Sequence, residues 1–520
     1  MTASLSRRSL MGAGAIGLAA FAVPGLTSCS TSSESPGPKG AKPVTGGSLR
    51  VGLTGGGSTE SLDPHFQFLA PDLVRSFALY AYLGEHDGQA KPSPLLAESV
   101  EPSDAKATTW DIRLRKGLEF HNGKTVSSDD LIFSLRRMLD PAMQSSGALL
   151  LPWVDAQSLK AMDERTVRVT LDRSVSIFDE ALFNFLTTVL PVDFDPANPV
   201  GAGPFKFDSF TPGDRSVFTR FDNYFAGSSY VDQLEVITFN DDTAQINALL
   251  GSEIDIAGGL SPAGAAVGEQ SGITVVTTPS MGWQPLTMRM DVAPFDDPQV
   301  RAAFRLIADR DQIVEQTYSG RGAARNDMYG WDSDGYLADV DQRAQDLEEA
   351  RALLEAAGLT DLTIDLQTTP ALPGQVEICQ VFAEQAKAAG VTVNVNKSTP
   401  DVYYAKHYLS AEFATDTFAN VPYLNNTLQC QLSTSPYNAT HWSDDEFNAL
   451  YDKALSTTDA AARAAVIEDM QRIQHERGSL LIAASFDGLD ATSTQVNGLR
   501  SNESWAFPMN GYHLERVWLS

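Results

Sequence analysis

Hydrophobic and polar residues alternate along several short segments in the first part of the chain. Alternation places every second side chain on the same face, which predicts β-strands over 48–53, 109–115 and 166–171. The first segment runs into the turn-rich sequence TGGGSTESLDPH. This part of the chain is therefore predicted to be rich in strands.

Further along, the apolar residues recur with a helical period. One amphipathic helix is predicted to begin at Asp296 and to end near Gly320. The later elements are helices over 347–357 and 376–389, strands over 362–366 and 391–395, and a helix opened by a capping box at 443–446. Helices and strands in turn, with short connections, predict an α/β fold.

The N-terminus carries the pattern of an export signal. Arg7 and Arg8 precede an apolar run over 10–23 that is too short to span a bilayer, which predicts a twin-arginine-like signal peptide over 1–28. The sequence LTSC resembles the lipobox of bacterial lipoproteins, in which the thiol, here Cys29, is acylated. A buried apolar segment with a chance cysteine is the alternative. Residues 29–46 lack apolar content and are predicted to be a flexible tether, so the protein is expected outside the cell, anchored to the membrane by lipid.

Length, charge and cysteine content narrow the class further. A chain of 520 residues exceeds what one hydrophobic core usually serves, so two or more lobes are expected. A formal charge of −28 repels nucleic acid and anionic headgroups, and neither is an expected partner. Besides Cys29, only Cys379 and Cys430 occur, and the sequence leaves open whether they pair or remain separate buried thiols.

The stretch FHNGKTVSSDDLIFS, residues 120–134, has the composition of a catalytic loop. Each polar residue nevertheless has a structural use. Asn122-Gly123 signals a turn after a strand, and Ser127 or Ser128 can cap the helix that follows. We therefore interpret the stretch as scaffold and not as a catalytic site around His121.

Other patterns that suggest chemistry are weak. A literal GxGxxG match lies inside the signal segment at 12–17, and Asp332-Ser-Asp-Gly335 reads as a surface turn rather than a calcium loop. The seven His residues lack metal-ligand spacing, and a GxSxG motif is absent. We expect no metal, no cofactor and no enzymatic activity, although a triad assembled in space stays open.

Six segments together resemble the family 5 extracellular solute-binding proteins, the oligopeptide, dipeptide and nickel type that serves ABC importers. They are LDPH (62–65), the long block 94–141, GAGPFKF (201–207), DNYFAG (222–227), the block 294–314 and ARALLEAAG (350–358). The resemblance implies an α/β, two-lobed periplasmic-binding-protein-like clam with an additional subdomain in lobe one. It places lobe one at 47–280 plus 486–520, the subdomain at about 89–200, and lobe two at 281–485.

The resemblance also implies a function. A monomer of this family captures a small-molecule or short-peptide ligand by lobe closure and delivers it to ABC permease and ATPase subunits, with the membrane contacted through the lipidated Cys29. A secreted hydrolase, or a sensor or cell-wall protein without transport, are the alternatives. The structure of a hydrolase would show a nucleophile, a base and an orienting group together in the cleft.

The ligand residues of the family carry over only in part. Many peptide-binding members have a Trp and then an Asp that receives the peptide amino group. Here Phe418 stands near the Trp position and Asn420 near the Asp position, with Tyr423 following. An Asn offers hydrogen bonds without a counter-charge, which argues against a peptide with a free amino group.

Three further residues are candidate ligand contacts. Arg289 stands where the family commonly has Asn and could clamp a carboxylate, or pair with a neighbouring acid. Trp283 could form an aromatic floor or pack at the lobe boundary, and Ser58 lies in a glycine-rich turn that allows close approach of a ligand. Arg289 and Asn420 together lead us to expect that a polar or anionic solute binds better than a cationic one.

Overall fold

The computed structural model describes residues 42–520 except 58–59, 68, 88–90 and 501–506. The predicted signal segment 1–28, Cys29 as the predicted site of acylation, most of the predicted tether and Ser58 therefore lie outside the described residues. The chain divides into two compact units, Met1–Glu34 and Ser35–Ser520, and the description below concerns the second.

The largest sheet has nine strands and collects residues from both halves of the sequence. Strands β1 and β10 pair in parallel, as do β1 and β11, whereas the neighbouring pairs are antiparallel. The order is β18 (Phe418–Ala419), β12 (Thr274–Trp283), β20 (Ala484–Thr492), β11 (Ile256–Gly258), β1 (Ser48–Thr54), β10 (Gln233–Phe239), β9 (Arg215–Arg220) and β8 (Phe205–Thr211), with β14 (Gly322–Ala324) also on β20. Helices α1 (Ala70–Leu79), α4 (Asp242–Leu250) and α5 (Pro262–Gln270) pack against this sheet.

A second sheet of five strands lies within the later α/β part. Its order is β16 (Thr392–Lys397), β15 (Thr363–Thr368), β17 (Phe413–Thr415), β13 (Leu286–Met288) and β19 (Leu480–Leu481). Its helices are α6 (Pro298–Ile307), α7 (Arg310–Tyr318), α8 (Leu347–Ala356), α9 (Gln375–Ala388) and α10 (Pro400–Lys406). Strands β15 and β16 and helices α8 and α9 confirm the predicted succession to within three residues at each end.

Two of the predicted helix boundaries are wrong. The single helix expected from Asp296 to Gly320 is two helices, α6 and α7, because Asp309 caps a new helix by accepting a hydrogen bond from the Gln312 backbone at 3.0 Å. The helix predicted to open with a capping box at Ser443 is α12 (Asp445–Ser456), and its cap is Asp444, which accepts from the Phe447 backbone at 2.9 Å.

A third sheet, of four strands, carries the FHNGK stretch at its side. Its order is β4 (Ala97–Pro102), β5 (Thr109–Leu114), β7 (Thr166–Thr170) and β6 (Lys160–Ala161). The same part of the chain also contains a two-stranded sheet of β2 (Gly84–His86) and β3 (Pro92–Pro94), and the helices α2 (Ser128–Leu139) and α3 (Phe178–Leu182). Both ring nitrogens of His121 meet backbone groups, the Gly203 carbonyl at 3.0 Å and the Gly201 amide at 3.3 Å. Burial lowers the pKa of His121 to about 4, and Ser127 caps α2, so both residues have structural uses in the fold.

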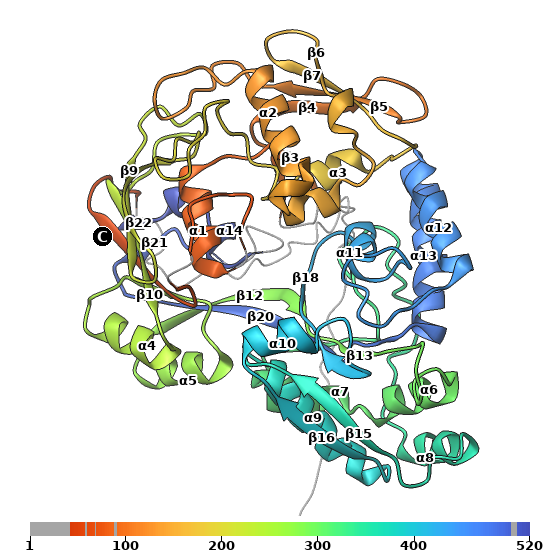
Figure 1. The fold of residues 1–520 in the computed structure, drawn as a ribbon. Helices are drawn as coiled ribbons and strands as arrows, with labels where there is room; N and C mark the ends of the chain where they lie inside the picture. The colour runs from red at the N-terminus through yellow and green to blue at the C-terminus, as the bar shows by residue number, and fades with distance from the viewer. Residues whose placement is uncertain (1–41, 58–59, 68, 88–90, 501–506) are drawn as a thin grey trace, which may run out of the picture. The chain divides into compact units, whose positions relative to one another are not determined.

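The chain passes between the nine-stranded and five-stranded sheets at several places, and two of these connections are adjacent. Strand β12 ends at Trp283 and β13 begins at Leu286, while β19 ends at Leu481 and β20 begins at Ala484. A further short connection leads from β17 to β18. Figure 1 shows β12 and β20 side by side, and the pair Trp283–Ser485 lies at their crossover end. Short connections at the ends of elements are segments that can act as a hinge.

The remaining helices are α11 (Tyr423–Cys430), α12, α13 (Ala460–Arg477) and α14 (Pro508–Gly511). Helices α12 and α13 pack against each other, whereas α14 contacts β12 and β20 of the nine-stranded sheet. Within the described residues, none of the helices combines the length and the apolar character that a membrane crossing needs.

Candidate ligand-binding site

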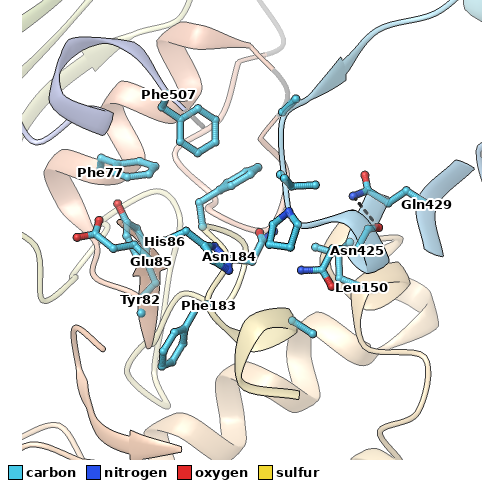
Figure 2. Close-up of a pocket in the computed structure, with 16 residues that line it drawn as sticks. Phe77, Tyr82, Glu85, His86, Leu150, Phe183, Asn184, Asn425, Gln429 and Phe507 are labelled. Carbon is cyan, nitrogen blue, oxygen red and sulfur yellow. Dashed lines mark hydrogen bonds between the residues drawn. The ribbon is translucent and has the colours of Figure 1, made fainter. Parts of the chain in front are cut away.

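A pocket with a cavity of about 170 Å³ lies between two distant parts of the chain (Figure 2). One wall is aromatic and comes from α1, β2 and the segment after α3. Its rings are Phe77, Tyr82, Phe183, Phe185 and Phe507. The other wall comes from β18 and α11 and is formed by Ala419, Val421, Pro422, Asn425 and Gln429.

The aromatic wall is held by contacts among its own rings. The Phe77 and Tyr82 ring centroids lie 4.6 Å apart, and Phe507 meets Phe77 at 5.8 Å and Phe185 at 5.3 Å, all edge to face. Phe77 is fixed because it is one of the apolar residues that α1 buries against the nine-stranded sheet. The wall is therefore built before any ligand binds.

Ionisable groups are few around the pocket. Of its sixteen described residues, only Glu85 and His86 carry a carboxyl or an imidazole group. Burial lowers the pKa of His86 to about 4, so its ring is neutral at pH 7. The Glu85 carboxylate lies 2.6 Å from His513 Nε2, and His513 Nδ1 lies 3.0 Å from Glu515.

The imidazole of His513 is protonated. Its burial alone would lower its pKa, but charge attraction and hydrogen bonds from Glu515 and Glu85 outweigh burial and raise the pKa to about 10. Glu85 is therefore neutralised by a cation that belongs to the protein.

Behind the second wall, four rings stack face to face. Trp283 lies between Phe418, at 4.7 Å, and Tyr329, at 5.1 Å, and Tyr329 continues to Tyr423 at 5.0 Å. Trp283 has no exposed surface, and Phe418 and Tyr423 are 8% and 1% exposed. The structure thus brings three predicted site residues together, but as packing behind the pocket and not among the residues that line it.

Asn420 lies in the same segment and is 1% exposed. Its side-chain amide donates to Asp332 at 2.7 Å, and its backbone amide donates to Met281 at 2.9 Å. The residues on either side of it, Ala419 and Val421, line the pocket. Because successive residues of an extended segment point to opposite faces, a shift of one position exchanges ligand contacts for packing residues.

Arg289 lies elsewhere. Its guanidinium holds the Asp291 carboxylate in a bidentate pair, at 2.7 and 3.0 Å, and donates to the Ser410 carbonyl at 2.8 Å. The hydrogen bond to Asp291 raises the pKa of Arg289. This is the alternative in which the arginine pairs with a neighbouring acid, and Arg289 is not among the residues around the pocket. Ser58 lies outside the described residues.

The sequence did not indicate the residues that line the pocket. They come from positions as far apart as Phe77 and Phe507, which share no local spacing. The only signal in the chain is the amide-rich sequence NNTLQCQ at 425–431, where Asn425 and Gln429 stand one helical turn apart on α11.

None of the sixteen described residues around the pocket is Ser, Thr, Cys or Lys. In the described part of the chain, no group of three or more His, Cys, Asp or Glu side chains is placed to hold a metal ion. Cys379 and Cys430 are both free and buried, which settles the open question of their pairing.

Together, the α/β architecture, the double crossover and a walled pocket define a solute-binding protein. The family model "Bacterial extracellular solute-binding proteins, family 5 Middle" matches residues 91–434, and this chain belongs to that family. The fold is that of its two-lobed binding proteins.

Proteins similar to this chain are found both by sequence and by structure. "Di/tripeptide-binding protein 2" of Pseudomonas aeruginosa is 26% identical over 493 residues, covering 87% of this chain and 90% of that protein. Among solved structures, DppA of Helicobacter pylori in complex with the peptide STSA has a TM-score of 0.78 at 20% identity, covering 92% of this chain and 98% of the other. AgaA of A. tumefaciens in complex with agropinic acid has a TM-score of 0.77 at 24% identity, covering 91% and 99%.

Proposed function

We propose that this protein is the lipid-anchored substrate-binding component of an ABC importer. It captures a peptide-like or other small polar solute and delivers it to a membrane permease. The observation that carries the proposal is the pocket, whose two walls come from 77–185 with Phe507 and from 419–429. On the proposed division into 47–280 plus 486–520 and 281–485, these walls belong to different lobes.

The proposed mechanism is closure of the two lobes on the ligand. A ligand that touches both walls binds the closed form more tightly than the open form, and this difference in affinity shifts the equilibrium between them. The paired crossovers from β12 to β13 and from β19 to β20 are the connections about which the lobes would rotate. No covalent step is involved.

The proposed class of solute is inferred in part from the ligands for which similar proteins are named. They include proteins named for binding dipeptides, oligopeptides and heme. A peptide-like solute fits the pocket because Asn425 and Gln429 offer amide groups of the kind that pair with peptide bonds.

The proposed anchor is a lipid on Cys29, followed by the tether 29–46. Two or three acyl chains on one cysteine hold a protein firmly, and a tether keeps its local concentration near the permease high. Mass spectrometry of the membrane-extracted protein would detect the acylated Cys29. We expect Cys29→Ser to release the protein from the membrane, and a variant that remains there would contradict this part of the proposal.

Lobe closure can be measured with a pair of spin labels. Leu250 and Leu372 are 50% and 40% exposed and lie in different proposed lobes, so cysteines introduced there report the distance between lobes. Leu250 with Val192, which is 48% exposed, gives a matched pair inside lobe one. We expect a mixture of di- and tripeptides to shorten the first distance and to leave the second unchanged.

Two results would count against the proposed function. The first is a ligand that raises the melting temperature but leaves the distance between Leu250 and Leu372 unchanged. The second is uptake of that solute, by cells that lack this gene, at the rate of the parent cells. Either result would favour a rigid binding protein outside transport.

A further inference from the structure

We propose that the part of the solute held in this pocket is an uncharged aromatic group carrying an amide, and that His513 is the residue that keeps the pocket selective for it. The inference rests on the proposed function and names its solute class. It replaces the expectation that a polar or anionic solute binds better than a cationic one, because that expectation rested on Arg289 and Asn420, which pair with Asp291 and Asp332.

The shape and lining favour an aromatic ring. A dry apolar cavity of roughly 150 Å³ accepts a benzene molecule, and the cavity here is about 170 Å³. Phe77, Phe185 and Phe507 present edges and faces to it, and aromatic pairs gain about 0.5–1.5 kcal/mol beyond the burial of their area. Figure 2 shows Phe77 and Phe507 on one side and Asn425 and Gln429 on the other.

The opposite wall offers hydrogen bonds without charge. Within the described residues, the Asn425 side chain makes no hydrogen bond, and Gln429 uses only its Nε2, which donates to the Asn425 carbonyl at 3.3 Å. The free groups are therefore one complete amide and one amide oxygen. This combination of donors and acceptors complements an amide group of the solute.

Among the described residues, the charges linked to Glu85 through His513 balance. Glu85 and Glu515 carry two negative charges, and His513 and Arg516, whose Nε lies 3.5 Å from Glu515, carry two positive charges. No Lys or Arg occurs among the sixteen residues described around the pocket, and His86 is neutral. An ammonium or a carboxylate that entered would therefore be desolvated without a partner, which costs several kcal/mol.

His513 holds this balance from outside the cavity. His513 is 6% exposed and does not line the pocket. Its Nε2 nevertheless contacts Glu85, the one carboxylate among the described lining residues. Removing its charge leaves Glu85 free to pair with a cation. His513 is thus a positioning residue whose effect appears in the selectivity for charge and not in the affinity alone.

The test compares four phenylalanine derivatives that share one aromatic side chain and differ in charge. The probes are N-acetylphenylalaninamide, phenylalaninamide, N-acetylphenylalanine and phenylalanine, titrated into Ser35–Ser520 by calorimetry at pH 7. We expect the neutral probe to bind at least about tenfold more tightly than each charged one, a difference of about 1.4 kcal/mol. Equal or tighter binding of any charged probe, or no binding of the neutral probe, overturns the inference.

Two variants test the role of His513. His513→Gln should improve the binding of phenylalaninamide relative to the neutral probe by about tenfold, since about 1.4 kcal/mol of attraction to Glu85 becomes available. The double variant Glu85→Gln/His513→Gln, in which both charges are removed, should restore the preference for the neutral probe. An unchanged ratio in His513→Gln overturns the role of His513. If His513→Gln does not fold, the double variant decides: the role of His513 is overturned if the double variant no longer prefers the neutral probe.

The failure of this inference can be told apart from failure of the proposed function. Should phenylalanine or a free dipeptide bind best and shorten the distance between Leu250 and Leu372, the importer role stands and the solute class is wrong. Should the neutral probe bind without any change in that distance, the solute class stands and the proposed lobe closure is wrong.

Discussion

Trp283 offers the sharpest test of how the site is built, because the sequence left open whether it contacts the ligand or packs at the lobe boundary, and in the structure it is packing. It is fully buried between Phe418 and Tyr329, and its indole N–H has no hydrogen-bond partner among the described residues. Trp283→Ala removes the centre of the stack, and truncations of this kind cost about 3–5 kcal/mol.

Trp283→Phe should behave very differently. It keeps an aromatic ring in the stack and removes the indole N–H. A buried donor without a hydrogen-bond partner lowers the stability of the fold by about 1–3 kcal/mol. This gain offsets the loss of about two buried carbon groups, at about 0.8 kcal/mol each. The net change in the free energy of unfolding should be within about 1 kcal/mol.

Trp110 provides the matched control. It is also buried, at 3% exposure, but its indole N–H donates to the Ala107 carbonyl at 3.1 Å. Trp110→Phe loses the same atoms together with a satisfied hydrogen bond, so it should be at least about 1.5 kcal/mol more destabilising than Trp283→Phe.

Differential scanning calorimetry measures both effects. With about 2.1 cal/mol/K per residue over roughly 490 residues, the entropy of unfolding is about 1 kcal/mol/K for a single transition. Each kcal/mol then lowers the melting temperature by about 1 °C. The reasoning is refuted if Trp283→Phe destabilises as much as Trp110→Phe, or if it weakens the binding of N-acetylphenylalaninamide tenfold without a change in stability.

Three further predictions concern charge and thiols. Burial raises the pKa of Asp416 from 3.8 to about 7, so the protonated carboxyl stabilises the fold at low pH and this contribution is lost as pH rises towards and through 7; the melting temperature of Asp416→Asn minus that of the parent should therefore grow from pH 5 to pH 8, and parallel profiles would exclude a raised pKa. Arg289→Ala removes a partly exposed ion pair and should cost no more than about 1 kcal/mol, with solute affinity unchanged by calorimetry; a tenfold loss of affinity would return Arg289 to the site. Burial raises the pKa of Cys379 to about 12 and also raises that of Cys430, so neither thiol should react with a thiol reagent at pH 8 until the protein is denatured, and rapid labelling of the folded protein would contradict their burial.

The local sequence pattern was sufficient to predict the secondary structure of segments whose conformation depends on neighbouring residues alone. Strands such as β5 and β16 follow from alternation, and α8 ends where Gly358, at a φ of +77°, allows the left-handed turn after a helix. The break between α6 and α7 was missed although its signal is local, because Asp309 is a second cap inside a continuous apolar period. Short motifs also identified the family, because they occur in the family's order along most of the chain.

The site was beyond reach of local pattern for a different reason. The segment 416–423 was identified, but whether Phe418 and Asn420 or Ala419 and Val421 face the solute depends on the phase of the segment against β12, which long-range pairing sets.

The amino-acid sequence by itself predicted an export signal and determined the α/β elements and the membership in a solute-binding family, because each depends on neighbouring residues or on motifs in order. Only the tertiary structure decided which rings form the pocket and which charges cancel there. Glu85 and His513 are 428 positions apart in the sequence, and the energy of a charge depends on the distance to its partner in space and not along the chain.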